Sequence, residues 1–115
     1  EALTGELKFR EVRYDELLHD YHKTVIAAFS DVENALTGTK QTLAEVNAQK
    51  EAGQEAKIAY ELSQKQFAAG LINIDTVLNA ERVLFDANDA LTQAKIAHLQ
   101  TLVGLSKALG GGWRS

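Results

Sequence analysis

Two histidines, His19 and His22, lie three residues apart and close to the carboxylates of Asp15 and Glu16. Side chains three or four positions apart share one face of a helix, and these residue types can bind a divalent metal. The spacing supplies no third strong ligand, however, so we predict no metal site. The remaining histidine, His98, replaces a large apolar residue in a repeating pattern and is expected to pack as a polar residue.

No other combination of residues has the spacing of a catalytic site. The chain has no cysteine, which excludes a disulfide, a thiolate metal site and a cysteine nucleophile. No Ser–His–Asp arrangement, glycine-rich phosphate loop or pair of catalytic carboxylates can be assembled. The carboxylates are instead spread along the chain near Lys and Arg, as in the pair Glu61 and Lys65, where each pair adds about 0.2–0.5 kcal/mol to helix stability. The sequence therefore predicts a protein that is not an enzyme and binds no cofactor.

Charge and hydropathy exclude two classes of partner. A formal net charge of −4 does not suit the neutralisation of phosphates, so no nucleic acid is expected. A helix that binds reversibly to a membrane surface would need a basic polar face, which the same net charge of −4 does not favour. No apolar run approaches the roughly 18–20 residues that span a bilayer. The sequence starts at Glu1 rather than at methionine, and we expect a fragment or a processed piece of a longer protein.

The elements that would position these residues are helices. The 115 residues include no proline and are dominated by Ala, Leu, Glu, Gln and Lys, which lose least on entering a helix. Over about residues 4–69 nothing stops a helix firmly, and such a helix would be about 98 Å long, as in a coiled coil. Its apolar positions recur at steps of four and three and then become alanine-rich: Tyr14, Leu18, Tyr21, Val25, Ala28, Val32 and Ala35, followed by Ala52, Ala56, Ala59 and Leu62.

A second helix is predicted over about residues 75–109, where apolar residues step by three and four without a break. Large and small residues alternate along this line, which lets a neighbouring helix approach closely. The line forms a helix-packing seam of Val77, Ala80, Leu84, Ala87, Leu91, Ala94, His98, Thr101, Leu105 and Ala108. More apolar residues lie outside this seam, so the helix is expected to need more than one neighbour. They are Leu78, Phe85, Ile96, Leu99 and Leu102.

The two helical patterns are separated by the stretch "AAGLINID", residues 68–75. A glycine at Gly70 can end a helix in the left-handed conformation, and Asn73 or Asp75 can cap the next helix. We therefore predict an all-α antiparallel coiled-coil hairpin as a single unit, with its tip at residues 69–75 and a glycine-rich tail with Trp113 at residues 110–115. The alternative is one continuous helix through Gly70.

Three stretches in this order are typical of one protein family: "YHKTVIAAFSDVENAL" (21–36), "AAGLINIDTVLNAERVLFDA" (68–87) and "LVGLSKALGGGW" (102–113). They resemble the C-terminal repeat of TolC-like outer-membrane efflux proteins, most of all the lipoprotein subgroup. The resemblance implies a homotrimer with a twelve-stranded β-barrel in the outer membrane of a Gram-negative bacterium and a helical barrel in the periplasm. The chain would be the second of two periplasmic hairpins in each protomer.

The resemblance also implies roles for residues near the turn. Such tips dock a periplasmic adaptor (membrane fusion) protein, and the matching tip residues are Ala69, Gly70, Leu71, Ile72 and Asn73. Gly70 is expected both to make the turn and to take part in docking. For Leu71, contact with the adaptor and packing inside the turn remain equal alternatives.

A pore constriction is implied just past the tip, where many members of the family carry acids in a "DVLDA"-like motif. Here Thr76 and Asn79 stand where acids would be expected, and Asp75 lies one position earlier. One position on a helix is a rotation of about 100°. An aspartate ring that binds cations is therefore not expected, and Asn79 is placed to hydrogen-bond across a closed pore.

Two functions are compatible with such a hairpin. The leading hypothesis is the periplasmic portion of a trimeric outer-membrane export channel in a tripartite system. The alternative is a stand-alone coiled-coil interaction or scaffold module, such as the hairpin of an adaptor. Adaptor hairpins usually lie between lipoyl-like half-motifs rich in Gly and Val, and none is visible in this sequence, which favours the channel.

Overall fold

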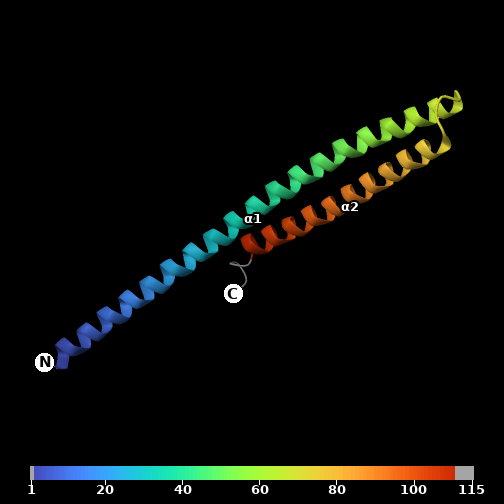
Figure 1. Cartoon of the computed structure of the whole chain (residues 1–115). Coiled ribbons are helices and arrows are strands. Elements are labelled where there is room, and N and C mark those ends of the chain that lie inside the picture. The colour runs from blue at the N-terminus through green and yellow to red at the C-terminus, as the bar shows by residue number, and fades with distance from the viewer. Residues whose placement is uncertain (1, 111–115) are drawn as a thin grey trace.

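The computed structural model describes residues 2–110, which form two long helices and the turn between them. Helix α1 spans Ala2–Ala68 and helix α2 spans Ile74–Gly110. The chain runs out along α1, reverses at the turn and returns along α2, giving a rod of 103 × 20 × 15 Å (Figure 1). The predicted fold class, an all-α helical hairpin, is confirmed.

The length of α1 follows from its composition. No proline interrupts its 67 residues, and at 1.5 Å per residue it accounts for nearly the whole long axis. Threonines inside the helix satisfy their hydroxyls locally, since Thr24 donates to the carbonyl of Asp20 and Thr39 to that of Ala35, both at 2.9 Å. The helix also continues past Gly38 and Gly53 without a break.

The turn is a Schellman motif built on Gly70, whose φ of 74° confirms the predicted left-handed conformation. The Leu71 N–H donates to the Gln66 carbonyl and the Gly70 N–H to the Phe67 carbonyl, each at 2.9 Å. After the turn, the Thr76 N–H donates to the carbonyl of Asn73 at 3.1 Å. Asn73 thus immediately precedes α2, in the capping position, and the alternative of one continuous helix is wrong.

The two helices pack along a narrow seam that contains mostly small side chains. On α1 the buried residues are Val46, Gly53, Ala56 and Ser63, and on α2 they are Val77 and Ala94. Hydrogen bonds between the helices show which residues lie opposite one another. The Tyr60 hydroxyl donates to Glu81 near the tip, and the Thr42 hydroxyl pairs with His98 and Thr101 farther away. No described side chain of large volume is fully buried, so the seam takes the place of a globular core.

In the second half of the predicted apolar line of α1, Ala56 is buried as expected, but the other three residues are wrong. Ala52, Ala59 and Leu62 are exposed, whereas Gly53 and Ser63 face α2. Steps of three and four continue unbroken from Ala35 through polar and small residues, and this spacing rather than the alanine content determines which side is buried. The residues on this side are Thr39, Thr42, Val46, Gln49, Gly53, Ala56, Tyr60 and Ser63.

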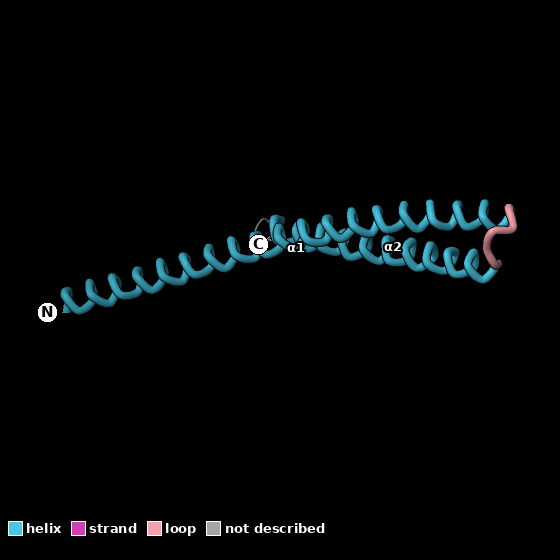
Figure 2. The backbone as a smooth tube through the Cα atoms, turned by 45° about the horizontal axis from the view of Figure 1, so that its top comes forward, coloured by secondary structure: helices cyan, strands magenta, loops and turns pink. Residues whose placement is uncertain are grey.

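The unequal helix lengths leave the first part of α1 without a helix beside it. α2 ends near the middle of α1, and the N-terminal part of α1 extends alone beyond it (Figure 2). All of residues 2–31 are exposed, including Tyr14, Tyr21 and Phe29. The expected glycine-rich tail with Trp113 lies mainly outside the described residues. Between Ala2 and Gly110, neither helix combines the length and the apolarity needed to cross a membrane.

Candidate functional site

The tip of the hairpin presents an apolar side chain to solvent. Leu71 is 74% exposed, whereas the neighbouring Ile72 is half-buried. In a Schellman motif the residue in the position of Leu71 often packs back onto the last turn of the helix. Here that contact covers only a small part of the side chain. Of the two alternatives for Leu71, packing inside the turn therefore does not account for its placement.

Gly70 is required by its backbone conformation and not by lack of space. A Cβ atom built on Gly70 would meet no heavy atom within 4 Å. Its φ of 74° lies in the left-handed region, where a residue with a side chain is strained by about 1–2 kcal/mol. Ala69 and Asn73, on either side of the turn, are exposed like Leu71. Four of the five tip residues are thus exposed at the turn, and Ile72 is half-buried.

The three residues of the predicted constriction lie on one exposed surface of the first turns of α2. Asp75, Thr76 and Asn79 are all exposed. Asn79 is four residues after Asp75 and three after Thr76, so all three side chains share a side of the helix. Asp75 is also the acid in the first turn, where the helix dipole favours negative charge. A role of these residues in a pore stays a prediction.

The residues of the predicted α2 seam all face α1. Val77 and Ala94 are 7% and 8% exposed. The other eight residues of the seam are half-buried: Ala80, Leu84, Ala87, Leu91, His98, Thr101, Leu105 and Ala108. Because small and large residues alternate along this line, the helices approach closely over most of the length of α2.

A polar layer crosses the seam at His98. Its Nδ1 lies 2.8 Å from the Thr42 hydroxyl, which is also 3.0 Å from the Thr101 hydroxyl. The Thr101 hydroxyl donates to the His98 carbonyl at 2.7 Å. His98 therefore packs as a polar residue with partners on both helices. The contribution of Thr42 was missed from the sequence, although its position seven residues after Ala35 in the same repeat was a usable signal.

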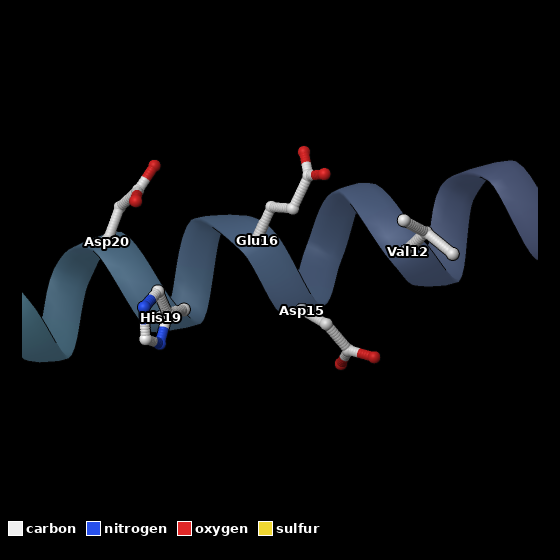
Figure 3. A pocket seen from close by; sticks show the side chains of 5 residues that line it. All are labelled: Val12, Asp15, Glu16, His19 and Asp20. Atoms are coloured by element: carbon white, nitrogen blue, oxygen red, sulfur yellow. The ribbon is translucent and has the colours of Figure 1, made fainter.

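The histidines of the N-terminal half do not assemble a metal site in the described part of the chain. No group of three His, Cys, Asp or Glu side chains there is placed to hold an ion. Val12, Asp15, Glu16, His19 and Asp20 line a shallow hollow on the exposed part of α1. Figure 3 shows why they do not converge, since Glu16 and Asp20 point to one side of the helix and Asp15 and His19 to the other.

A second apolar surface on α2 remains uncovered. We call it the outer stripe, made up of Leu78, Phe85, Ile96, Leu99 and Val103. These side chains are between 51% and 72% exposed, with Phe85 the most exposed of them. Large exposed apolar side chains that recur on one side of a helix are typical of helices that have further neighbours. Within the hairpin, α1 therefore covers only one of the two apolar surfaces of α2, the seam.

Comparison with known proteins gives one consistent set of relatives. Residues 1–111 match the family model described as outer membrane efflux protein. The chain is 40% identical over 103 residues to the pyoverdine export outer membrane protein OpmQ of Pseudomonas aeruginosa, covering 90% of this chain and 22% of that protein. It is 32% identical over 112 residues to the probable efflux pump outer membrane protein TtgC of Pseudomonas putida, covering 97% of this chain and 23% of that protein. No solved structure gives a significant match. The chain thus spans less than a quarter of the length of these two relatives.

Proposed function

The chain belongs to the outer membrane efflux protein family, and from this membership we propose that it forms a periplasmic helical hairpin of a trimeric outer-membrane efflux channel. Its tip docks a periplasmic adaptor protein of a tripartite export system. The hairpin lies in the periplasm of a Gram-negative bacterium, and each protomer of the channel contributes one copy. The alternative of an adaptor hairpin is not favoured, because the named relatives are outer membrane proteins.

The observation that carries the docking proposal is the exposed Leu71 on a rigid turn. Two backbone hydrogen bonds and the left-handed Gly70 hold the tip in one conformation. A preformed apolar side chain loses little conformational freedom on binding, so its contact area contributes more fully to affinity. Located at the end of a 103 Å rod, it is also accessible to a partner that approaches end to end.

The proposal of a larger helical assembly is supported by the apolar surfaces that the hairpin leaves open. The outer stripe of α2 has no helix over it, and residues 2–31 of α1 are exposed on every side. Covering an apolar side chain such as Leu99 contributes roughly 1.5–3 kcal/mol. A closed barrel of helices gives each helix two neighbours and would cover these surfaces. Within that barrel, Asp75, Thr76 and Asn79 would lie at the constriction next to the tip.

A photo-crosslinking experiment tests the docking proposal. A photoreactive amino acid is placed at position 71 of the full-length channel, which is expressed together with the adaptor of its export system. A matched control carries the same amino acid at position 85, because Phe85 is 72% exposed but lies on the side of α2. We expect a crosslink to the adaptor from position 71 and none from position 85. Capture of channel subunits alone from position 71, with the adaptor demonstrably present, would contradict docking at the tip.

A further inference from the structure

The seam of α2 is almost the same after every seven residues. From Ala80 to Ala108, one seam position of each repeat is leucine and the other is alanine, except where His98 and Thr101 stand. Such a repeat packs about equally well when one helix slides along the other by seven residues, unless a polar residue makes one repeat different from the rest. The apolar residues of α2 therefore do not determine its register, the alignment of α2 against α1.

The seam of α1 favours a slide in one direction. Beyond the end of α2 its spacing continues through Val25 and Leu18, which are 47% and 41% exposed. A slide of α2 by seven residues toward them is a movement of about 10.5 Å, and it would cover Val25. The turn is long enough to allow this slide, because the residues 69–73 between the two helices span up to about 17 Å when extended.

The polar layer at His98 distinguishes the two registers. In the structure its Nδ1 lies 2.8 Å from the Thr42 hydroxyl, and within residues 2–110 no buried side-chain nitrogen or oxygen lacks a hydrogen-bond partner. After the slide, each residue of α2 would face the α1 residue seven positions earlier, so His98 would lie opposite Ala35. Alanine has no hydrogen-bonding side chain, and a half-buried polar group without a partner is unfavourable.

The Thr42 hydroxyl is the centre of this layer. Three acceptors lie within 3.1 Å of it and compete for its single hydrogen: the carbonyls of Gly38 and Thr39 and the Thr101 hydroxyl, whose own hydrogen is donated to the His98 carbonyl. The group that can donate to the Thr42 oxygen is therefore the imidazole, through Nδ1–H. Ala35 reproduces none of these bonds.

We propose that the polar layer of Thr42, His98 and Thr101 sets the register of the hairpin and prevents α2 from sliding along α1. The layer lies 26 residues before the end of α1 at Ala68, or about 39 Å along the helix. It therefore fixes α2 at the end opposite to the turn. In the slid register residues 69–73 would be extended and the Schellman motif lost, so the tip surface exists in only one of the two registers. The proposal does not depend on what the tip binds.

Two cysteine pairs distinguish the registers. Gly53→Cys with Asn88→Cys reports the observed register, because a Cβ atom on Gly53 lies 3.7 Å from Oδ1 of Asn88. Gly53→Cys with Glu81→Cys reports the slid register, in which Glu81 would take the place of Asn88. Each pair is introduced into the full-length protein and treated with a thiol crosslinker shorter than the slide, and linked peptides are identified by mass spectrometry. With the polar layer intact, we expect the first pair to crosslink and the second not to.

Moving the polar layer should move the register. His98→Leu with Thr101→Ala completes the plain repeat, and crosslinking of positions 53 and 81 should rise at least about fivefold, since the slid register no longer leaves an imidazole unpaired. Adding Leu91→His with Ala94→Thr rebuilds the layer seven residues earlier, where it meets Thr42 only after the slide. In that protein, crosslinking of positions 53 and 81 should exceed that of positions 53 and 88.

Two results would overturn the proposal. One is unchanged crosslinking of positions 53 and 81 after the layer is removed, and the other is a predominant link between positions 53 and 88 after the layer is moved. Circular dichroism shows whether each variant keeps the helix content of the parent. If the protein with the moved layer does not fold, the protein without the layer decides the question alone.

Discussion

Gly70 and Gly53 are both glycines of the hairpin, yet replacement by alanine is expected to change the free energy of unfolding in opposite directions. Gly70 has a φ of 74°, and an alanine in this conformation is disfavoured by about 1–2 kcal/mol. Alanine also restricts the unfolded chain, which offsets about 0.4–1 kcal/mol of that cost. The net expectation for Gly70→Ala is a loss of about 1 kcal/mol.

Gly53 is buried inside α1 with ordinary helical geometry. A Cβ atom there would lie 3.7 Å from Oδ1 of Asn88, which is a normal van der Waals contact. Alanine is favoured over glycine inside a helix by about 1 kcal/mol. Gly53→Ala is therefore expected to stabilise the hairpin by up to about 1 kcal/mol.

Thermal unfolding followed by circular dichroism at 222 nm measures both changes. All three proteins are compared at one concentration, since association would raise the midpoint temperature. For a domain of this size 1 kcal/mol corresponds to roughly 4 °C, so the two variants should differ by about 8 °C. Two variants that shift in the same direction would refute the reasoning. A Gly70→Ala protein as stable as the parent would show that the turn does not need the left-handed conformation.

Three further outcomes are expected. Thr42→Val removes the hydroxyl that pairs with His98 and should lower the free energy of unfolding in urea by about 1 kcal/mol, whereas Thr42→Ser should restore it. Spin labels at Lys57 and Arg82 should lie side by side in a double electron–electron resonance measurement, and a separation near 38 Å, as in a continuous helix, would contradict the hairpin. Leu71→Asp should weaken adaptor binding in a pull-down without lowering the melting temperature, because this side chain is 74% exposed; a lower melting temperature would mean that Leu71 packs in the turn.

The structure could be predicted from the sequence where side-chain size or backbone conformation allows few arrangements, as in the seam of α2 and at the turn. Along α2 the alternation from Val77 to Leu105 identifies the side that is buried, because its steps of three and four continue without a break, whereas Thr92 and Ser106 interrupt the line of Leu78, Phe85 and Leu99. At the turn, Gly70 is the residue type that adopts a positive φ without strain. Both features depend on local chemistry, and both are found in the structure.

Other features depend on the shape of the interface and could not be read from hydropathy. On α1 the alanines lie both on and off the seam, so Ala52 and Ala56 give the same signal although only Ala56 is buried. Small polar residues such as Ser63 occupy positions where the two helices lie close together, because these positions require a small side chain rather than an apolar one. The exposure of Leu71 likewise depends on how far its side chain turns away from the last turn of α1. No pattern of residue types determines that direction.

The positions of the cross-helix contacts along the rod set an order for folding. The hydrogen bond from Tyr60 to Glu81 joins residues 21 apart in sequence, whereas that from Thr42 to Thr101 joins residues 59 apart. Closing a shorter loop costs less entropy. Contacts between the two helices should therefore form first beside the turn and then progressively toward the open end of the hairpin. Substitutions at Gly70 would then mainly slow folding, and substitutions at Thr42 would mainly speed unfolding. The segment that we propose to receive the adaptor would thus also be the one from which the hairpin folds.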